Sequence, residues 1–190
     1  MHFVFSLLMA VAIPDRPVVE VFIPSFMDRN LNRAFGQARG IVDEAYAEIG
    51  VQVVWRSINR APSGCAKKPG HRQIVLELLS GNPTDRNASA LAFAKPYLEE
   101  GPCVTLLIDR LKVEVDRNPQ STGMLLGHVL AHEIGHVLQG IARHSETGLM
   151  KERWSEREIR DMWKGRLGFT EHDKESILGP LQVVATHPSN

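Results

Sequence analysis

The chain has 190 residues, of which 43% are hydrophobic and 23% are charged, values typical of one soluble globular domain with its own core. Lysine and arginine together number 22, and aspartate and glutamate also number 22. This balance argues against nucleic acid or an anionic membrane as the main partner, because both select a basic surface. No apolar run reaches the roughly 20 residues that a membrane-spanning helix needs, so we expect no membrane span. The composition leaves the oligomeric state open.

The N-terminal segment 1–12 contains a short apolar run that ends in Ala10-Val11-Ala12, similar to the cleavage site of a secretory signal. No Lys or Arg precedes this run, so a buried N-terminal strand is the alternative. We expect a secreted or periplasmic protein in which residues 13–190 form a single domain. The two cysteines, Cys65 and Cys103, would form one disulfide in an exported protein and remain buried thiols in a cytosolic one.

The first part of the chain predicts a strand, a long helix and a second strand. Val18–Phe22 is rich in residues that favour strands. From Asp28 to Ile49 the apolar residues recur at steps of three and four, which gives one apolar face of a helix. Gly50 stands where a C-terminal cap belongs. Val51–Ile58 alternates apolar and polar residues and therefore predicts a half-buried strand.

The middle of the chain predicts loops and further strands. Arg60–His71 holds two prolines and two glycines and is expected to be a loop. Gln73–Leu79 predicts a strand, and the continuous apolar run Cys103–Ile108 is typical of a central one. Between them Ala88–Ala94 is weakly patterned, and Pro96 limits it to an edge strand. A loop rich in Asp, Asn and Pro is expected after the central strand.

The last third is predicted to be helical. Met124–Gln139 follows a plausible helix start at Ser121 and is apolar on most faces, so this helix is expected to be buried under the sheet. Ser155–Trp163 begins with a serine that Glu158 follows three positions on, a capping box, and Thr170–Ile177 is similar. The order of elements predicts an α+β domain, with a mixed β-sheet packed on a long helix and a buried helix.

The buried helix carries the sequence His132-Glu133-Ile134-Gly135-His136. Histidines four residues apart project from one helical face, one turn apart, so both can bind one zinc ion at about 2.0–2.1 Å. Glu133 lies too far round the helix to be the third ligand but is well placed to hold a water bound to the metal. Zinc lowers the pKa of such a water, and the carboxylate can take its proton and later deliver it to a leaving amine. The spacing therefore predicts two zinc ligands and a general base.

A catalytic zinc also needs a third protein ligand. His128 lies about 12 Å along the helix axis from His136, so we interpret it as a packed histidine rather than a ligand. His144 is the best candidate, but it can approach His136 only if the helix ends between them. Gly140 can end a helix in the left-handed conformation and turn the chain back. We therefore predict that the helix closes at Gly140.

A family resemblance extends this motif. The metzincin clan of zinc peptidases has the signature HExxHxxGxxH followed by a tight turn that contains methionine. The chain resembles it over roughly residues 124–151, through HEIGH, Gly140, His144-Ser145 and Leu149-Met150. The steps from the second histidine to the glycine, and from there to the third histidine, are four here and three in the family. The resemblance implies a zincin-like fold with a small C-terminal helical part. It also implies His132, His136 and His144 as zinc ligands, Glu133 as the general base and Met150 beneath the metal.

The alternative third ligand is a carboxylate on the following helix, as in the thermolysin-like clan, with Glu156 and Glu158 as candidates. We expect a zinc-dependent endopeptidase that acts on a peptide or protein substrate. Ala88–Ala94 would be the edge strand along which an extended peptide binds, and Lys151–Trp154 would line the pocket. Two other functions remain open. One is a catalytically silent zincin-like domain for metal binding or recognition, and the other is a metal-dependent hydrolase of a non-peptide amide.

Overall fold

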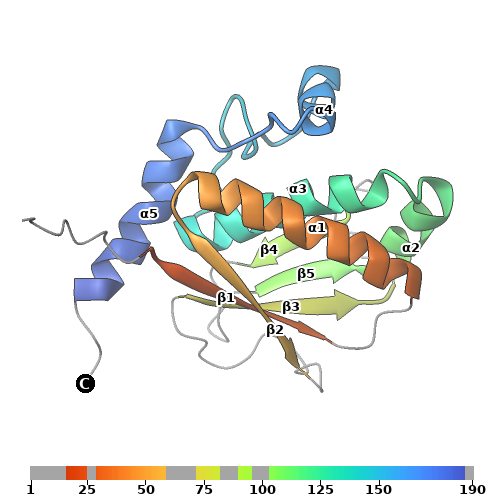
Figure 1. Ribbon diagram of the computed structural model, residues 1–190, viewed down its shortest axis with the longest axis horizontal. Coiled ribbons are helices and arrows are strands. Elements are labelled where there is room, and N and C mark those ends of the chain that lie inside the picture. The colour runs from red at the N-terminus through yellow and green to blue at the C-terminus, as the bar shows by residue number, and fades with distance from the viewer. Residues whose placement is uncertain (1–15, 25–28, 59–71, 82–89, 96–102, 187–190) are drawn as a thin grey trace, which may run out of the picture.

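A five-stranded mixed sheet forms the base of the fold (Figure 1). The structure is a computed structural model that describes residues 16–24, 29–58, 72–81, 90–95 and 103–186, with side chains as far as residue 182. The strands lie in the order β2-β1-β3-β5-β4. Four of them are parallel, and only β4, at the edge, runs antiparallel to its neighbour β5. Their bounds are β1 Val18–Pro24, β2 Gln52–Ile58, β3 Gln73–Leu79, β4 Ala92–Lys95 and β5 Cys103–Leu107.

Five helices complete the described part of the chain: α1 Arg29–Glu48, α2 Ile108–Arg117, α3 Thr122–Gln139, α4 Glu156–Trp163 and α5 Glu171–Thr186. Figure 1 shows α1 and α3 on the same side of the sheet, with α4 farther from it. Apolar side chains of the strands, α1 and α3 form one continuous core. The predicted architecture, a mixed sheet on a long helix and a buried helix, is confirmed. None of the described helices combines the length and apolarity needed to cross a membrane.

Two glycines fix how closely α3 approaches α1. A Cβ atom on Gly123 would lie 2.2 Å from Gln37 Oε1, and one on Gly127 would lie 2.7 Å from Ile41 Cβ. The helices can therefore pack at this distance only because both positions lack a side chain. The buried hydroxyl of Tyr46 in α1 also donates a hydrogen bond of 3.0 Å to a carbonyl oxygen of α3, that of Ala131. These contacts fix the position of the helix that carries the histidines.

Two expectations about the helices are wrong. The segment after β5 is not a loop but α2, because Ile108, Leu111 and Val115 recur at steps of three and four and are all buried. The last helix does not end at Ile177 but runs to Thr186 through Pro180. Proline normally breaks a helix because it lacks an N–H group. Here the buried residues on either side of it, Ile177 and Leu181, hold the helix against the core.

Some expectations fall on other parts of the chain. The expected signal segment 1–12, the loop Arg60–His71 and residues 88–89 of the expected edge strand lie outside the described residues. Cys103 is fully buried and disulfide-bonded, and Cys65 lies outside the described residues.

Candidate metal centre

The helix α3 ends at Gly140, as predicted. This residue adopts the left-handed conformation, with φ 65° and ψ 17°, and its N–H donates to the carbonyl oxygen of Val137. Because the left-handed conformation favours glycine, the position explains why the helix stops here. The chain then turns back toward α3, and His144 returns to the side of the helix that carries His136.

Three histidines meet at this bend. The Nε2 atom of His136 lies 3.0 Å from Nε2 of His132 and 3.2 Å from Nε2 of His144. Among the described residues, these three form the one group of His, Cys, Asp or Glu side chains whose potential ligand atoms all lie within 4.8 Å of one another. His132 and His136 are buried, whereas His144 is exposed. The cluster is therefore reached from the protein surface.

The other ring nitrogens define the tautomers of the two buried histidines. Nδ1 of His132 lies 2.8 Å from the carbonyl oxygen of Leu149, and Nδ1 of His136 lies 3.3 Å from that of Ile141. A carbonyl only accepts, so each Nδ1 donates and each Nε2 carries a lone pair. The 3.0 Å contact between these Nε2 atoms consequently joins two acceptors, which repel unless a cation lies between them. Tetrahedral zinc would separate its nitrogen ligands by about 3.3 Å, so the donor set fits zinc.

Burial and mutual proximity keep these imidazoles neutral. Burial lowers the pKa of His132, and burial together with the neighbouring His132 and His144 lowers the pKa of His136 to about 4. Neutral imidazole is the form that binds a metal ion. The site is thus ready to accept a cation at neutral pH without first losing protons from the two buried rings.

Leu149 and Met150 form a buried turn against α3. Both residues are fully buried, and the N–H of Ser145 donates to the carbonyl oxygen of Met150 at 2.9 Å. A Cβ atom on Gly135 would lie 2.6 Å from Met150 Sδ, so the methionine packs directly on the helix at its glycine. The turn also supplies the Leu149 carbonyl that orients His132.

Asp173 was not predicted, yet it holds the far side of the centre. This carboxylate is fully buried and accepts hydrogen bonds from the Thr170 N–H at 2.9 Å, the Thr170 hydroxyl at 2.7 Å and the Ser145 hydroxyl at 2.5 Å. It thereby ties the residue after His144 to the first turn of α5. The threonine-to-aspartate spacing of three was visible as a capping pattern, but nothing in the sequence linked it to Ser145.

Trp154 is a second residue whose role in the centre was not predicted. Its Nε1–H donates to the Leu149 carbonyl at 3.2 Å, the same oxygen that accepts from His132. Its ring also meets the His132 ring edge to face, with centroids 5.8 Å apart. Both contacts restrict the orientation of the His132 imidazole.

Glu133 faces a cleft beside the histidines. Its Oε2 atom accepts a hydrogen bond of 2.7 Å from the Ala94 N–H of the edge strand β4. The cleft has a volume of about 710 Å³. It is lined by Ala90–Ala92, Leu125, Val129, His132, Glu133 and Lys151–Trp154. Both segments expected to border the pocket, the one at the edge strand and the one after Met150, are therefore at its wall.

The remaining candidate ligands lie outside the cluster. Glu158 accepts hydrogen bonds from the Ser155 N–H and hydroxyl and from Lys151, and these contacts lower its pKa to about 2. Glu156 is exposed and lies 3.6 Å from Arg160. His128 is buried, and its Nδ1 donates to the Met124 carbonyl oxygen at 2.9 Å. None of Glu156, Glu158 and His128 belongs to the group of converging ligand atoms.

Comparison with protein-family models and with curated proteins finds no match. Among solved structures, archaemetzincin from Methanopyrus kandleri is 18% identical over 90% of this chain and 99% of its own, with a TM-score of 0.55. Metalloproteinase-II from Bacteroides fragilis is 12% identical over 88% of this chain and 54% of its own, with a TM-score of 0.48. The GM1-bound form of the ECX AB5 holotoxin is 13% identical over 87% of this chain and 79% of that chain, with a TM-score of 0.42. The similarity to archaemetzincin shows that this chain has a zincin-like fold.

Proposed function

We propose that this protein is a zinc-dependent endopeptidase of the metzincin type. His132, His136 and His144 would hold the metal, and Glu133 would act as the general base. The observation that carries this proposal is the convergence of the three Nε2 atoms, with contacts of 3.0 and 3.2 Å, on the zincin-like fold. Two of these atoms carry lone pairs because their Nδ1 partners donate to carbonyl oxygens. In this tautomer the facing lone pairs repel, and a cation bound between them would remove the repulsion.

The chain's own residues supply the proton transfers. When bound, zinc would lower the pKa of a water molecule and polarise the carbonyl of a peptide bond. Glu133 stands next to His132 on α3 and faces the cleft, where it would accept a proton from the attacking water and return it to the leaving nitrogen. The hydrogen bond from the Ala94 N–H positions the carboxylate between the helix and the edge strand.

The cleft favours an extended peptide as the substrate. The strand β4 pairs only on its β5 side within the described sheet, and such an edge can bind a peptide as one more strand. Leu125, Val129 and Trp154 form an apolar part of the cleft wall beside the metal centre. An apolar side chain of the peptide would be buried there.

The test combines metal analysis with hydrolysis. Purified protein should contain about one zinc per chain and cleave unfolded protein substrates. Glu133→Ala should keep the zinc and lose at least about a hundredfold in cleavage rate. Glu175→Ala, which changes an exposed glutamate of α5, is the matched control and should keep both. Zinc binding with undiminished cleavage in Glu133→Ala would refute the mechanism, and zinc binding without cleavage of any peptide would favour a silent domain or an amide hydrolase of another class.

We also propose that the protein is exported to the periplasm or the cell exterior. The disulfide at Cys103 supports this, because disulfides persist mainly in oxidising compartments. Expression with the natural N-terminus in a bacterial host should give an exported form that lacks residues 1–12 by mass spectrometry and contains no free thiol. A cytoplasmic product of full mass would contradict the proposal.

A further inference from the structure

A second cavity of about 460 Å³ lies beside His128, whose ring contacts Trp154, the residue that also contacts His132 of the metal centre. Side chains from α1, α3 and α4 line it, together with residues 165–169. None of the three clustered histidines, nor Glu133, is among its lining residues. It is therefore separate from the cleft that the proposed reaction uses.

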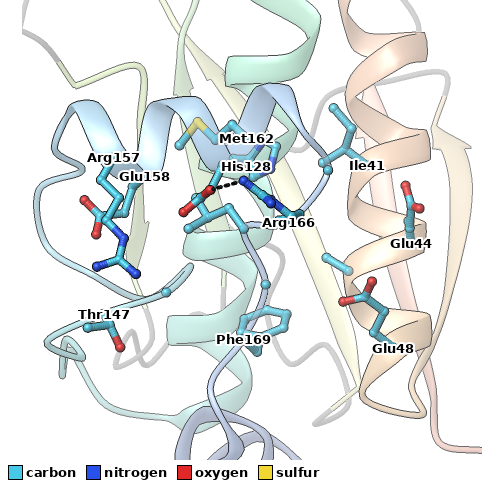
Figure 2. A pocket seen from close by; sticks show the side chains of 16 residues that line it. Ile41, Glu44, Glu48, His128, Thr147, Arg157, Glu158, Met162, Arg166 and Phe169 are labelled. Atoms are coloured by element: carbon cyan, nitrogen blue, oxygen red, sulfur yellow. Dashed lines mark hydrogen bonds and ion pairs between the residues drawn. The ribbon is translucent and has the colours of Figure 1, made fainter.

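The walls of this cavity carry opposite charges (Figure 2). Glu44 and Glu48 of α1 lie on one side, one helical turn apart, and Arg157 of α4 lies on the other side. Within the described residues, none of these three side chains has an ion-pair partner. Arg166, by contrast, already pairs with Asp161 at 3.1 Å. Like charges four residues apart repel and weaken a helix, so the fold itself gains nothing from placing Glu44 and Glu48 together.

His128 adds a hydrogen-bond acceptor at the lining of the cavity, between these walls. The residue is only 5% exposed, and its Nδ1 donates to the Met124 carbonyl oxygen at 2.9 Å. Its Nε2 is thus an acceptor, and no hydrogen-bond partner for it is present among the described residues. Burial lowers the pKa of His128, which keeps the ring neutral. This acceptor belongs to a residue that lines the cavity, so it can take a hydrogen bond from a donor bound there.

We propose that this cavity binds a short zwitterionic peptide, about two residues long. Glu44 and Glu48 would bind its ammonium group, Arg157 its carboxylate, and His128 would accept a hydrogen bond from one of its N–H groups. The dimensions agree with this length, because a volume of about 460 Å³ corresponds to a width of roughly 8 Å, and two extended residues span about 7 Å. Apolar side chains of the lining, among them Met162 and Phe169, would contact the peptide's side chains.

Two sets of contacts connect the lining of the cavity with the metal centre. The Trp154 ring meets His128 edge to face at 6.5 Å and His132 at 5.8 Å between centroids. Lys151, at the wall of the cleft, pairs with Glu158, at the wall of the cavity, at 3.0 Å. Short peptides are products of the proposed peptidase, so the cavity would be a product site next to the active centre. That interpretation rests on the proposed function, whereas the binding itself does not.

The experiment measures binding of the dipeptide Gly-Leu by isothermal titration calorimetry. Zinc-loaded and metal-free protein should bind one molecule per chain with similar affinity. Acetyl-Gly-Leu, which lacks the ammonium group, and Gly-Leu-amide, which lacks the carboxylate, should each bind at least about tenfold more weakly. The double variant Glu44→Gln/Glu48→Gln and the variant Arg157→Gln should lose affinity for Gly-Leu by a similar factor. Glu175→Gln and Arg33→Gln, which change exposed charges elsewhere, should bind as the wild type does.

Two results would overturn the proposal. One is the absence of any binding up to the solubility limit of the dipeptide. The other is binding that needs zinc and is unchanged in Glu44→Gln/Glu48→Gln, since this would place the dipeptide at the metal centre. Failure of the proposed function is recognised separately. A protein that binds Gly-Leu but cleaves no peptide would support the dipeptide site and refute the peptidase. A protein that cleaves peptides but does not bind Gly-Leu would support the peptidase and refute the dipeptide site.

Discussion

Replacing Gly135 with alanine should force the Met150 side chain away from α3. The added methyl carbon would lie 2.6 Å from Met150 Sδ and 3.2 Å from its Cε, and Met150 is fully buried with little room to move. Overpacking of this kind costs about 1–3 kcal/mol. Alanine gains about 1 kcal/mol over glycine inside a helix. The expected net loss in the free energy of unfolding is therefore between about 0 and 2 kcal/mol.

A double-mutant cycle separates these two effects. Met150→Ala alone should cost about 2–5 kcal/mol, because it leaves a cavity. In that background the methyl group of Gly135→Ala meets no sulfur, and its next neighbour, Phe169 Cε1, lies at an ordinary 3.5 Å. There the same substitution should stabilise the protein by up to about 1 kcal/mol, which gives a coupling energy of about 1–3 kcal/mol. Gly36→Ala, at a helical glycine with no atom within 4 Å of the added carbon, is the control and should stabilise by a similar amount.

The measurement is urea unfolding of the metal-free protein, followed by zinc-competition titration of each variant. We expect Gly135→Ala to weaken zinc binding as well, since Met150 belongs to the turn whose Leu149 carbonyl orients His132. Additive effects of the two substitutions, within about 0.5 kcal/mol, would show that the glycine is not needed for the methionine's approach.

Three further predictions concern the bend, the buried carboxylate and the capping box. Gly140→Ala should lower the free energy of unfolding by about 1–2 kcal/mol through the left-handed backbone alone, because no atom lies within 4 Å of the added carbon. Zinc competition should show weaker zinc binding by this variant. An unchanged zinc affinity would contradict a role for the bend in placing His144. Asp173→Asn should lower the free energy of unfolding by about 2–4 kcal/mol in urea titrations, since a fully buried carboxylate loses charge-assisted hydrogen bonds; a loss below about 0.5 kcal/mol, the level of a surface substitution, would refute its anchoring role. Glu158→Gln should destabilise the protein at pH 7. This difference in stability should shrink as the pH falls from 4.5 toward 2, because Glu158 has its pKa lowered from 4.5 to about 2 and stabilises the fold only while ionised. The control Glu156→Gln, which changes an exposed glutamate, should show no such pH dependence.

The sequence predicted best those elements whose periodicity extends over several turns. The apolar face of α1 recurs along the whole helix, and the pattern indicates all of its buried residues except Tyr46, which is buried in place of the neighbouring Ala45. The end of α3 was predictable because Gly140 is the one residue there suited to a left-handed conformation. By contrast, α2 has only three buried apolar residues among charged ones, too few to distinguish a short helix from a loop. Pro180 would ordinarily end a helix, but packing of its neighbours Ile177 and Leu181 against the core lets α5 continue.

The contacts of the metal centre are likewise of two kinds, those that helical spacing predicts and those that it does not. The approach of His132 to His136 follows from helical geometry alone, because four residues make about one turn. The contact between Ser145 and Asp173 joins residues 28 positions apart, and no local pattern records it. Trp154 and the Leu149 carbonyl are likewise brought to His132 by the turn and not by spacing on a helix. Contacts of this kind depend on the completed fold.

The position of His144 depends less on the exact spacing of the signature than on the contacts that hold the residue after it. The chain between His136 and His144 has one residue more on each side of the glycine than the metzincin pattern, yet the two Nε2 atoms lie 3.2 Å apart. On the far side, Ser145 is held twice: its N–H donates to the Met150 carbonyl, and its hydroxyl donates to Asp173. His144 is therefore fixed from its C-terminal neighbour, and the segment after Gly140 only has to cover the distance. Four residues can span about 13 Å, so an added residue changes the shape of the loop without moving the ligand.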